Sequence, residues 1–317
     1  MALLGRPGLR RAVQGFRRRG AGTGCRPRGL SSALVPAAGD GYTLCFPVAQ
    51  EAALRIVTWN INSVRLRLDM VLRLVDDYGP DILCLQETKV IDDAFPLKAL
   101  ADRGYVHAHV RGMKSYNGVA ILSRLPLSGT GGALWCERQD CRHVQAELPG
   151  GIELHNFYIP AGGDIPDPDL NDKFRHKLRF LDELAAWGEA LEDRRKPRIL
   201  VGDLNIAPLE NDVWSHRQLL NVISHTPIEV EKMDAMMQAG EWVDAVRHFL
   251  PASEKLYTWW SYRSADWGLS DRGRRLDHIW VTPPLVPRLL GYTVLREARG
   301  WGPKPSDHVP VMIDLDV

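Results

Sequence analysis

The sequence predicts an α/β protein in which two mixed β-sheets pack together and are covered by helices. From Leu54 onward, short apolar runs alternate with amphipathic stretches and with Gly/Pro punctuation. Two neighbouring runs, 143–148 and 152–159, look like an antiparallel pair, and a mixture of this kind indicates two packed sheets flanked by helices. No long linker interrupts the pattern, so residues 54–317 are interpreted as one domain of about 260 residues.

The expected strands are short apolar runs bounded by turn residues, and the expected helices have apolar residues three and four positions apart. The strands are Leu54–Trp59, Ile82–Leu85, Gly118–Ser123, His143–Leu148, Ile152–Ile159, Arg198–Val201, Leu276–Val281 and Val309–Leu315. The helices are Leu66–Asp77, Asp169–Leu191, Glu229–Ala239 and Trp242–His248.

Residues 1–53 differ from the rest in charge and composition. Residues 1–50 carry eight Arg, no Lys and one acid, a net charge of +7, so the other 267 residues carry −6 within the formal total of +1. A segment rich in Arg, Gly, Pro and Ala without apolar periodicity is expected to be disordered. Two interpretations stay open: a basic tail, including one added by a misplaced start codon, and a mitochondrial transit peptide, which is typically Arg-rich and poor in acids.

The cysteines and the apolar runs limit the class of protein. The five cysteines form no CxxC pair, and their odd number argues against a disulfide framework, which indicates a reducing compartment. No apolar run approaches the roughly 20 residues that a membrane-spanning helix requires, so the sequence predicts a soluble protein.

Polar side chains follow or interrupt the buried-looking strands at six places. They are Asn60 with Asn62, Glu87, Asn156 with Tyr158, Asp203 with Asn205, Asp277, and Asp307 with His308. Taken singly, an Asn or Asp at the end of a strand is more often a turn residue. Taken together, carboxylates beside Asn, Tyr and His, without a Cys or His ligand cluster, predict an oxygen-rich site that suits Mg²⁺ or Mn²⁺ rather than Zn²⁺.

Two segments of the chain share one plan. Residues 55–62 and 198–205 each contain a basic residue, an apolar strand, and then a polar residue, an apolar residue and Asn. Since residues i and i+2 of a strand point to the same side, both strands can deliver polar groups to one edge of a sheet sandwich. A chance match remains the alternative.

Five motifs occur in order along the predicted domain. They are Trp59-Asn60-Ile61-Asn62, Leu85-Gln86-Glu87-Thr88-Lys89, Gly202-Asp203-Leu204-Asn205, Leu276-Asp277 and Ser306-Asp307-His308-Val309-Pro310. This set resembles the endonuclease/exonuclease/phosphatase superfamily, and residues 86–89 with 257–264 narrow the resemblance to its exonuclease III branch, the apurinic/apyrimidinic (AP) endonucleases. The resemblance covers residues 54–317 and implies a four-layered α/β sandwich and a metal-dependent phosphodiesterase.

The resemblance also implies a metal site. Glu87 corresponds to the main Mg²⁺ ligand, supported by Asn60 and, in some metal arrangements, by Asp307. Mn²⁺ is expected to substitute for Mg²⁺.

The catalytic roles implied by the resemblance fall on five residues. Asp203 would activate the attacking water, and Asn205 would hold phosphate oxygens. His308 would bind the scissile phosphate, oriented by a hydrogen bond to Asp277. Tyr158 would contact the phosphate or orient Asp203.

Aromatic and basic residues near these motifs are the candidates for DNA contact. Trp259 or Trp260 would stack against an abasic gap, and strand alternation lets only one of them face it. Lys89, Arg111 and Arg274 are the candidate cations. Core packing for the tryptophans and solvated faces for the cations are the alternative interpretations.

The segment after Tyr158 departs from the branch. It reads Ile159-Pro160-Ala161-Gly162-Gly163, where a Gln-Gly pair is common, and an Asp-Pro-rich loop over 164–169 follows. We expect this loop to change contacts with the DNA strands, which leaves the balance of endonuclease and exonuclease activity open.

The resulting hypothesis is a monomeric DNA repair nuclease that incises 5′ to abasic sites and has 3′→5′ exonuclease and 3′-phosphatase or phosphodiesterase activity. Its partner would be duplex DNA with abasic sites or blocked 3′ ends. The expected location is a bacterial cytoplasm, in association with the nucleoid, or mitochondria if the leader is a transit peptide. The alternatives are a superfamily phosphatase acting on inositol or phospholipid phosphates, and a DNA-binding module without catalysis.

Overall fold

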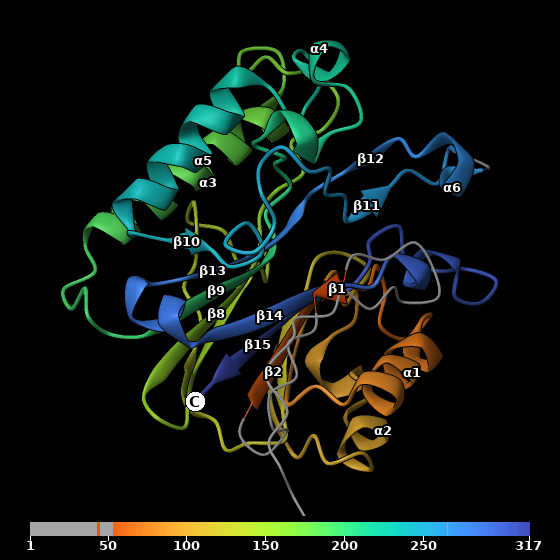
Figure 1. Ribbon diagram of the computed structural model, residues 1–317, viewed down its shortest axis with the longest axis vertical. Coiled ribbons are helices and arrows are strands. Elements are labelled where there is room, and N and C mark those ends of the chain that lie inside the picture. The colour runs from red at the N-terminus through yellow and green to blue at the C-terminus, as the bar shows by residue number, and fades with distance from the viewer. Residues whose placement is uncertain (1–42, 45–52, 265) are drawn as a thin grey trace, which may run out of the picture. The chain divides into compact units, whose positions relative to one another are not determined.

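The computed structural model describes residues 43–44, 53–264 and 266–317, which belong to one structural unit. Apart from Thr43, Leu44 and Ala53, the Arg-rich segment predicted over 1–53 lies outside the described residues. Two mixed β-sheets with flanking helices form this unit (Figure 1), which confirms the predicted α/β class. No helix of the described part is long and apolar enough to cross a membrane.

The first sheet has seven strands in the order β1-β14-β15-β2-β3-β5-β4. Their bounds are β1 (Thr43–Leu44), β2 (Ala53–Asn60), β3 (Ile82–Gln86), β4 (His107–Arg111), β5 (Val119–Ser123), β14 (Leu289–Val294) and β15 (Val311–Asp316). β2 and β3 pair in parallel, with Asn60 opposite Gln86, and the other neighbours are antiparallel. Parallel neighbours end at the same edge of a sheet, so β2 and β3 bring their polar ends together.

The second sheet has six strands in the order β10-β13-β9-β8-β7-β6. Their bounds are β6 (Ser128–Gly131), β7 (His143–Leu148), β8 (Ile152–Tyr158), β9 (Arg198–Asp203), β10 (Val243–Asp244) and β13 (Asp277–Val281). The parallel pair β8/β9 sets Tyr158 opposite Asp203, and the antiparallel pair β9/β13 sets Asp277 opposite the same Asp203. β11 (Trp259–Trp260) and β12 (Gly273–Arg274) form a separate short ribbon.

Helices cover the outer face of each sheet, which gives four layers (Figure 1). The α-helices are α1 (Leu68–Tyr78), α2 (Leu97–Ala101), α3 (Asp172–Glu189), α4 (His216–Leu219), α5 (Pro227–Ala239) and α6 (Trp267–Ser270). Short 3₁₀ helices lie at Asp92–Ala94, Glu210–Asp212, Pro283–Arg288 and Arg296–Gly300. α1 and α2 lie beside the first sheet, whereas α3 packs Phe180 and Leu184 with Phe157 of β8 and Trp280 of β13 in one core cluster.

The structure confirms the eight predicted strands and three of the predicted helices, with ends shifted by a few residues. The helix predicted over 242–248 is wrong. Val243–Asp244 form β10, which pairs with β13, and the Asp244 carboxylate accepts hydrogen bonds from the backbone nitrogens of Val246 and Arg247. An Asp that bonds the backbone just after it favours a turn over a helix, which overrides the apolar spacing.

A buried amide pair joins the two sheets beneath the polar strand ends. Asn156 Nδ2 donates to the carbonyl oxygens of Leu85 (3.0 Å) and Ala120 (2.9 Å), and Gln86 Nε2 donates to Asn156 Oδ1 (2.7 Å). A buried amide left without partners would cost about 1–3 kcal/mol. These bonds therefore fix the position of β8 against β3 and β5.

Buried neutral histidines make the fold sensitive to acid, and His278 is the clearest case. Its side chain is fully buried, and Nε2 donates to the Ile206 carbonyl at 2.8 Å. Burial, aided by the charge of Arg275, lowers the pKa of His278 to about 3. Between pH 6.5 and 3 the unfolded chain therefore binds a proton that the folded chain does not, so stability falls as the pH drops below about 6.5.

We predict that His278→Gln reduces this acid sensitivity. His278 alone should contribute a loss of about 1.4 kcal/mol in unfolding free energy per pH unit below about 6.5, and Gln retains a side-chain donor without titrating. Urea denaturation of both proteins at pH 7 and pH 5 measures the difference. Parallel losses in the two proteins would contradict the assignment.

Candidate active site

The polar strand ends of both sheets converge on one buried group. Asp203 ends β9, and the sheet register places it between Tyr158 and Asp277. Gly202, just before it, has a φ of 144°, and a Cβ there would collide with the Phe157 carbonyl, so only glycine fits. Glycine at position 202 therefore allows the backbone conformation that places Asp203 at the edge of the sheet.

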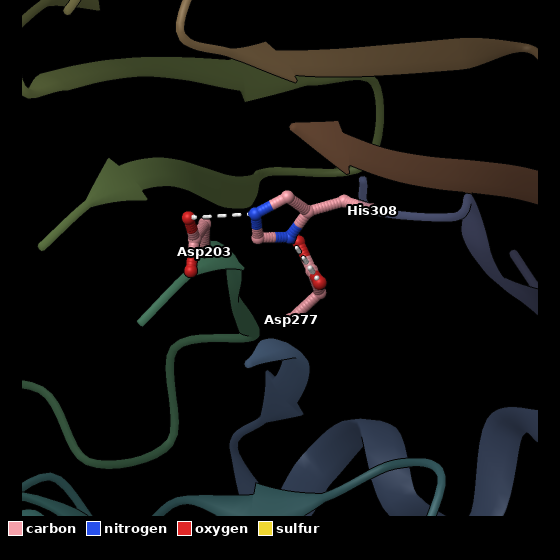
Figure 2. A group of neighbouring side chains, drawn as sticks. All are labelled: Asp203, Asp277 and His308. Atoms are coloured by element: carbon pink, nitrogen blue, oxygen red, sulfur yellow. Dashed lines mark hydrogen bonds and ion pairs between the residues drawn. The ribbon is translucent and has the colours of Figure 1, made fainter. Parts of the chain in front are cut away.

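His308 lies between two carboxylates, as Figure 2 shows. Its Nδ1 donates to Asp277 Oδ2 at 2.9 Å, and its Nε2 lies 3.7 Å from Asp203 Oδ2. All three residues are at most 4% exposed. The bond at Nδ1 fixes the orientation of the ring, so Nε2 points toward Asp203.

Burial and charge shift the proton affinities of this group. Burial by itself would lower the pKa of His308, but the charges of Asp277 and Asp203 outweigh it and raise the pKa to about 10. Burial raises the pKa of Asp203 to about 7, although the charge of His308 opposes the rise. Near neutral pH the group therefore contains an imidazolium and a carboxylate poised to accept a proton.

Glu87 lies just after β3 at a left-handed backbone position (φ 50°). It is the centre of a second group of hydrogen bonds in the site. Its Oε1 accepts hydrogen bonds from Asn60 Nδ2 (2.9 Å) and the Tyr158 hydroxyl (2.9 Å), and its Oε2 pairs with Lys89 Nζ (2.7 Å). Burial opposes ionisation, but Lys89 and the Asn60 amide outweigh it and lower the pKa of Glu87. Asn60 Nδ2 also donates to Asp203 Oδ2 (2.8 Å), so one amide links the two carboxylates.

Asp307 is the centre of a third group of hydrogen bonds. Its Oδ1 accepts from Asn62 Nδ2 (3.0 Å), and its Oδ2 accepts from Trp259 Nε1 (2.9 Å). Burial opposes ionisation, but His308 and these two donors lower the pKa of Asp307. Lys89 Nζ donates to Asn62 Oδ1 (2.6 Å) and also pairs with Glu87, so it connects the hydrogen bonds around Asp307 with those around Glu87. Asn62 is part of the Trp59-Asn60-Ile61-Asn62 motif, but its contacts with Asp307 and Lys89 could be seen only in the structure.

Asn205 is held beneath Asp203 in a left-handed conformation (φ 55°). Its backbone nitrogen donates to Asp203 Oδ1 (3.0 Å), and its Nδ2 donates to Asp203 Oδ2 (3.2 Å) and to the Ile159 carbonyl (2.9 Å). The carbonyl of Asn205 accepts from Lys177 Nζ (2.8 Å), and Lys177 is fully buried and paired with Glu229. Lys177 lies in a basic stretch with Lys173, Arg175 and Arg179, and the sequence does not distinguish it from these exposed cations.

The two tryptophans of β11 occupy different environments. Trp259 is half-buried and donates to Asp307, so it belongs to the site. Trp260 is 1% exposed, and its Nε1 donates to Asp271 Oδ1 (3.0 Å). Trp260 therefore packs in the core, and Trp259 is the ring that a ligand can reach.

The three candidate cations for DNA contact lie in different surroundings. Lys89 sits among Glu87 and Asn62, as described above. Arg274 lies over the Trp259 ring, 5.3 Å from its centroid, and borders a cavity of about 870 Å³ that Trp259 also lines. Arg111 donates to the carbonyl oxygens of Ala133 and His143, and so supports the loop before β7.

The donor chemistry decides where a metal ion fits. Among the described residues, Asp203, Asp277 and His308 form a group close enough to hold one. A protonated His308, however, has no lone pair to offer, and both carboxylates already face it. Glu87 and Asp307 offer ionised oxygens beside the Asn62 amide oxygen, a set that suits a hard divalent cation. Asn60 turns its nitrogen toward the carboxylates, because its oxygen accepts from the Asn62 backbone at 3.0 Å.

Comparison with known proteins identifies the family of the chain. The Endonuclease/Exonuclease/phosphatase family matches residues 57–308. Exodeoxyribonuclease III of Haemophilus influenzae is 29% identical and an exodeoxyribonuclease of Bacillus subtilis is 30% identical, each over 83% of this chain and 100% of the relative.

Solved structures agree with this result. An AP endonuclease from Archaeoglobus fulgidus superposes with a TM-score of 0.77 and 34% identity, and the Neisseria 3′ phosphatase NExo bound to a product DNA hairpin superposes with a TM-score of 0.76 and 32% identity. Each match covers 83% of this chain and 100% of the other. The chain therefore belongs to the endonuclease/exonuclease/phosphatase family, in its exonuclease III branch of metal-dependent nucleases.

Proposed function

We propose that this protein is a Mg²⁺-dependent DNA repair nuclease that cleaves duplex DNA 5′ to abasic sites and also removes nucleotides or blocking phosphates from 3′ ends. The observation that carries the proposal is the buried Asp203–His308–Asp277 group beside Glu87 and Asp307. The names of the similar proteins, exodeoxyribonuclease III, AP endonuclease and 3′ phosphatase, support the same reaction class.

The chain's own residues account for the movement of protons and the binding of phosphate. Asp203, whose pKa burial raises to about 7, accepts a proton from the attacking water. His308 carries a positive charge and donates from Nε2 to a non-bridging oxygen of the scissile phosphate, while Asp277 holds the ring. Tyr158 and Asn60 keep Glu87 in place through the two hydrogen bonds to Oε1.

Glu87 and Asp307, with Asn62 beside them, would hold the divalent cation. Bound there, Mg²⁺ would act as a Lewis acid that neutralises charge on the phosphate and steadies the leaving 3′ oxygen. Mn²⁺ accepts the same oxygen donors and is expected to substitute for it.

The cavity beside Trp259 favours DNA over the alternative substrates. About 870 Å³ in volume, it is lined by Trp214 and Trp259 with Arg272 and Arg274, and each guanidinium lies over an indole ring, at 4.8 and 5.3 Å. Aromatic rings with cations suit the bases and phosphates that flank an extruded abasic sugar. Inositol phosphates would use the cations but carry no base to stack on an indole ring.

Activity on a duplex with a single tetrahydrofuran residue tests the proposal. We predict Mg²⁺-dependent nicking 5′ to that residue, which EDTA abolishes. Glu87→Ala and Asp203→Ala should each lower turnover by about 10²- to 10⁴-fold, because one removes a metal ligand and the other the proton acceptor. Denaturing gels measure the product.

Glu254→Ala serves as the control for that assay, because Glu254 is an exposed acid outside the site and its loss should leave turnover unchanged. An enzyme that hydrolyses inositol phosphates but leaves the duplex intact would overturn the proposal.

The orienting role of Asp277 leads to a separate prediction. Asp277→Asn should lower kcat by about 10²-fold or more while changing the Kd for DNA only a few-fold, since the variant disturbs only the one phosphate contact made by His308 and leaves the other contacts with the DNA backbone in place. Single-turnover kinetics and fluorescence anisotropy separate the two quantities. Equal losses in kcat and in binding would count against this role.

The buried Lys177 gives a prediction about positioning. Lys177→Met should lower kcat, because the carbonyl of Asn205 loses its donor and Asn205 in turn holds both oxygens of Asp203. The single variant also leaves Glu229 buried without its cation, which is destabilising by about 3–5 kcal/mol. The double variant Lys177→Met/Glu229→Gln restores neutrality. We expect it to recover thermal stability but not kcat, and full recovery of both would refute the role.

A further inference from the structure

Arg67 is a buried cation to which the steps described above give no role. It is 6% exposed and lies just before α1, where its carbonyl accepts from the backbone nitrogens of Met70 (3.0 Å) and Val71 (3.1 Å). The acceptors of its side-chain hydrogen bonds are all neutral oxygens, and no ion pair joins it to another described residue. Because no carboxylate pairs with it, charge neutralisation does not explain why a guanidinium is buried here.

The guanidinium joins three segments of the chain. Nη1 donates to the carbonyl oxygens of Ile61 (3.3 Å) and Asn62, just after β2. Nε donates to the Lys304 carbonyl (2.9 Å) before β15, and Nη2 donates to the Tyr262 hydroxyl (2.8 Å) after β11. The Tyr262 hydroxyl donates in turn to the Pro305 carbonyl (2.8 Å), which adds a second link to the loop before β15.

The same three segments form the surroundings of Asp307. The loop before β15 carries Asp307 itself, the turn after β2 carries Asn62, and β11 carries Trp259. Asn62 donates to one carboxylate oxygen of Asp307, and Trp259 donates to the other. Arg67 therefore binds each segment that supplies Asp307 or one of these two donors.

The turn that carries Asn62 depends on contacts from outside. Asn62 and Ser63 are successive left-handed residues, with φ values of 47° and 88°, and neither is glycine. Such a backbone persists only where the surrounding structure holds it. The bonds from Arg67 to the Ile61 and Asn62 carbonyls hold one side of the turn, and the bond from the Ser63 nitrogen to the Glu87 carbonyl (2.7 Å) holds the other. Without the guanidinium, we expect the turn to relax and the Asn62 side chain to move away from Asp307.

We propose that Arg67 is a positioning residue for the divalent-cation site. It fixes the Asn62 amide oxygen relative to the Asp307 carboxylate by binding the backbone of both segments. The inference rests on the proposed function, because Glu87, Asp307 and Asn62 are the groups proposed there to hold the cation. A guanidinium suits this role, since its N–H donors point in several fixed directions.

Mn²⁺ binding to the full chain without DNA tests the proposal, and electron paramagnetic resonance of the free ion measures it without turnover. Arg67→Met removes the charge and the donors, whereas Arg67→Lys keeps the charge on a single nitrogen that cannot reach acceptors on three segments. We expect both variants to weaken Mn²⁺ binding by about tenfold, as the loss of groups that orient metal ligands usually does. Wild-type affinity in both variants would overturn the proposal, and so would full recovery in Arg67→Lys.

Arg198→Met is the control for the loss of a buried arginine. Arg198 is 5% exposed and donates to the Asp193 carbonyl, but it begins β9, at the opposite end of the strand from Asp203. We expect this variant to lower thermal stability and to leave the affinity for Mn²⁺ unchanged. A loss of affinity equal to that of the Arg67 variants would mean that destabilisation alone weakens the site, which would also overturn the proposal.

Tyr262→Phe provides a test at a half-exposed residue if neither Arg67 variant folds. The change removes one of the two links between the guanidinium and the loop before β15. It should weaken Mn²⁺ binding by about threefold, the loss expected for one hydrogen bond. Unchanged affinity would count against the role of Arg67.

Glu87→Ala separates a failure of this inference from a failure of the proposed function. If Glu87→Ala abolishes Mn²⁺ binding while the Arg67 variants bind like wild type, the cation site stands and only the role of Arg67 falls. If Glu87→Ala leaves Mn²⁺ binding unchanged, both the proposed cation site and the role of Arg67 are wrong.

Discussion

The buried imidazolium of His308, between two carboxylates, is the interaction on which the rest of the site depends. Asp203 and Asp277 face each other across β9 and β13, and each is 1% exposed. Like charges placed opposite each other in a sheet repel, and burial raises the cost of each charge. The positive charge of His308 offsets this repulsion. The register that brings these two carboxylates together is therefore tolerable only with a charged histidine beside them.

The position of His308 depends on contacts with both sheets. Ser306 Oγ donates to the Asn60 carbonyl (2.7 Å), and Trp59 Nε1 donates to the His308 carbonyl (3.0 Å), so the loop before β15 is tied to the first sheet. The His308 side chain bonds Asp277 of the second sheet. Any sliding of one sheet against the other would break this contact, and the Asn60 bond to Asp203 adds a parallel restraint. The geometry of the site and the packing of the two sheets thus depend on the same contacts.

The strands that carry the site could be predicted because each is a short apolar run that ends in polar residues. The pairing of Asp203 with Asp277 could not, since a register between distant segments leaves no local pattern. The failed helix over 242–248 shows the same limit, because Asp244 is held by Arg275, far away in sequence, through bonds of 2.8 and 2.6 Å. The role of Lys177 could not be predicted either, because only its complete burial distinguishes it from the exposed cations of α3.

The charge balance of the site explains how Lys89 can pair with a carboxylate and also be a candidate for DNA contact. The site contains the carboxylates of Glu87, Asp203, Asp277 and Asp307, whereas the cations that contact them are Lys89 and His308. Ionisation of all four leaves two negative charges without a partner, which a divalent cation would neutralise. Lys89 already occupies Glu87 Oε2 and Asn62 Oδ1, two of the oxygens that would receive that cation. A metal there would displace the ammonium from these oxygens. We therefore propose that Lys89 compensates carboxylates in the free protein and contacts phosphates in the complex.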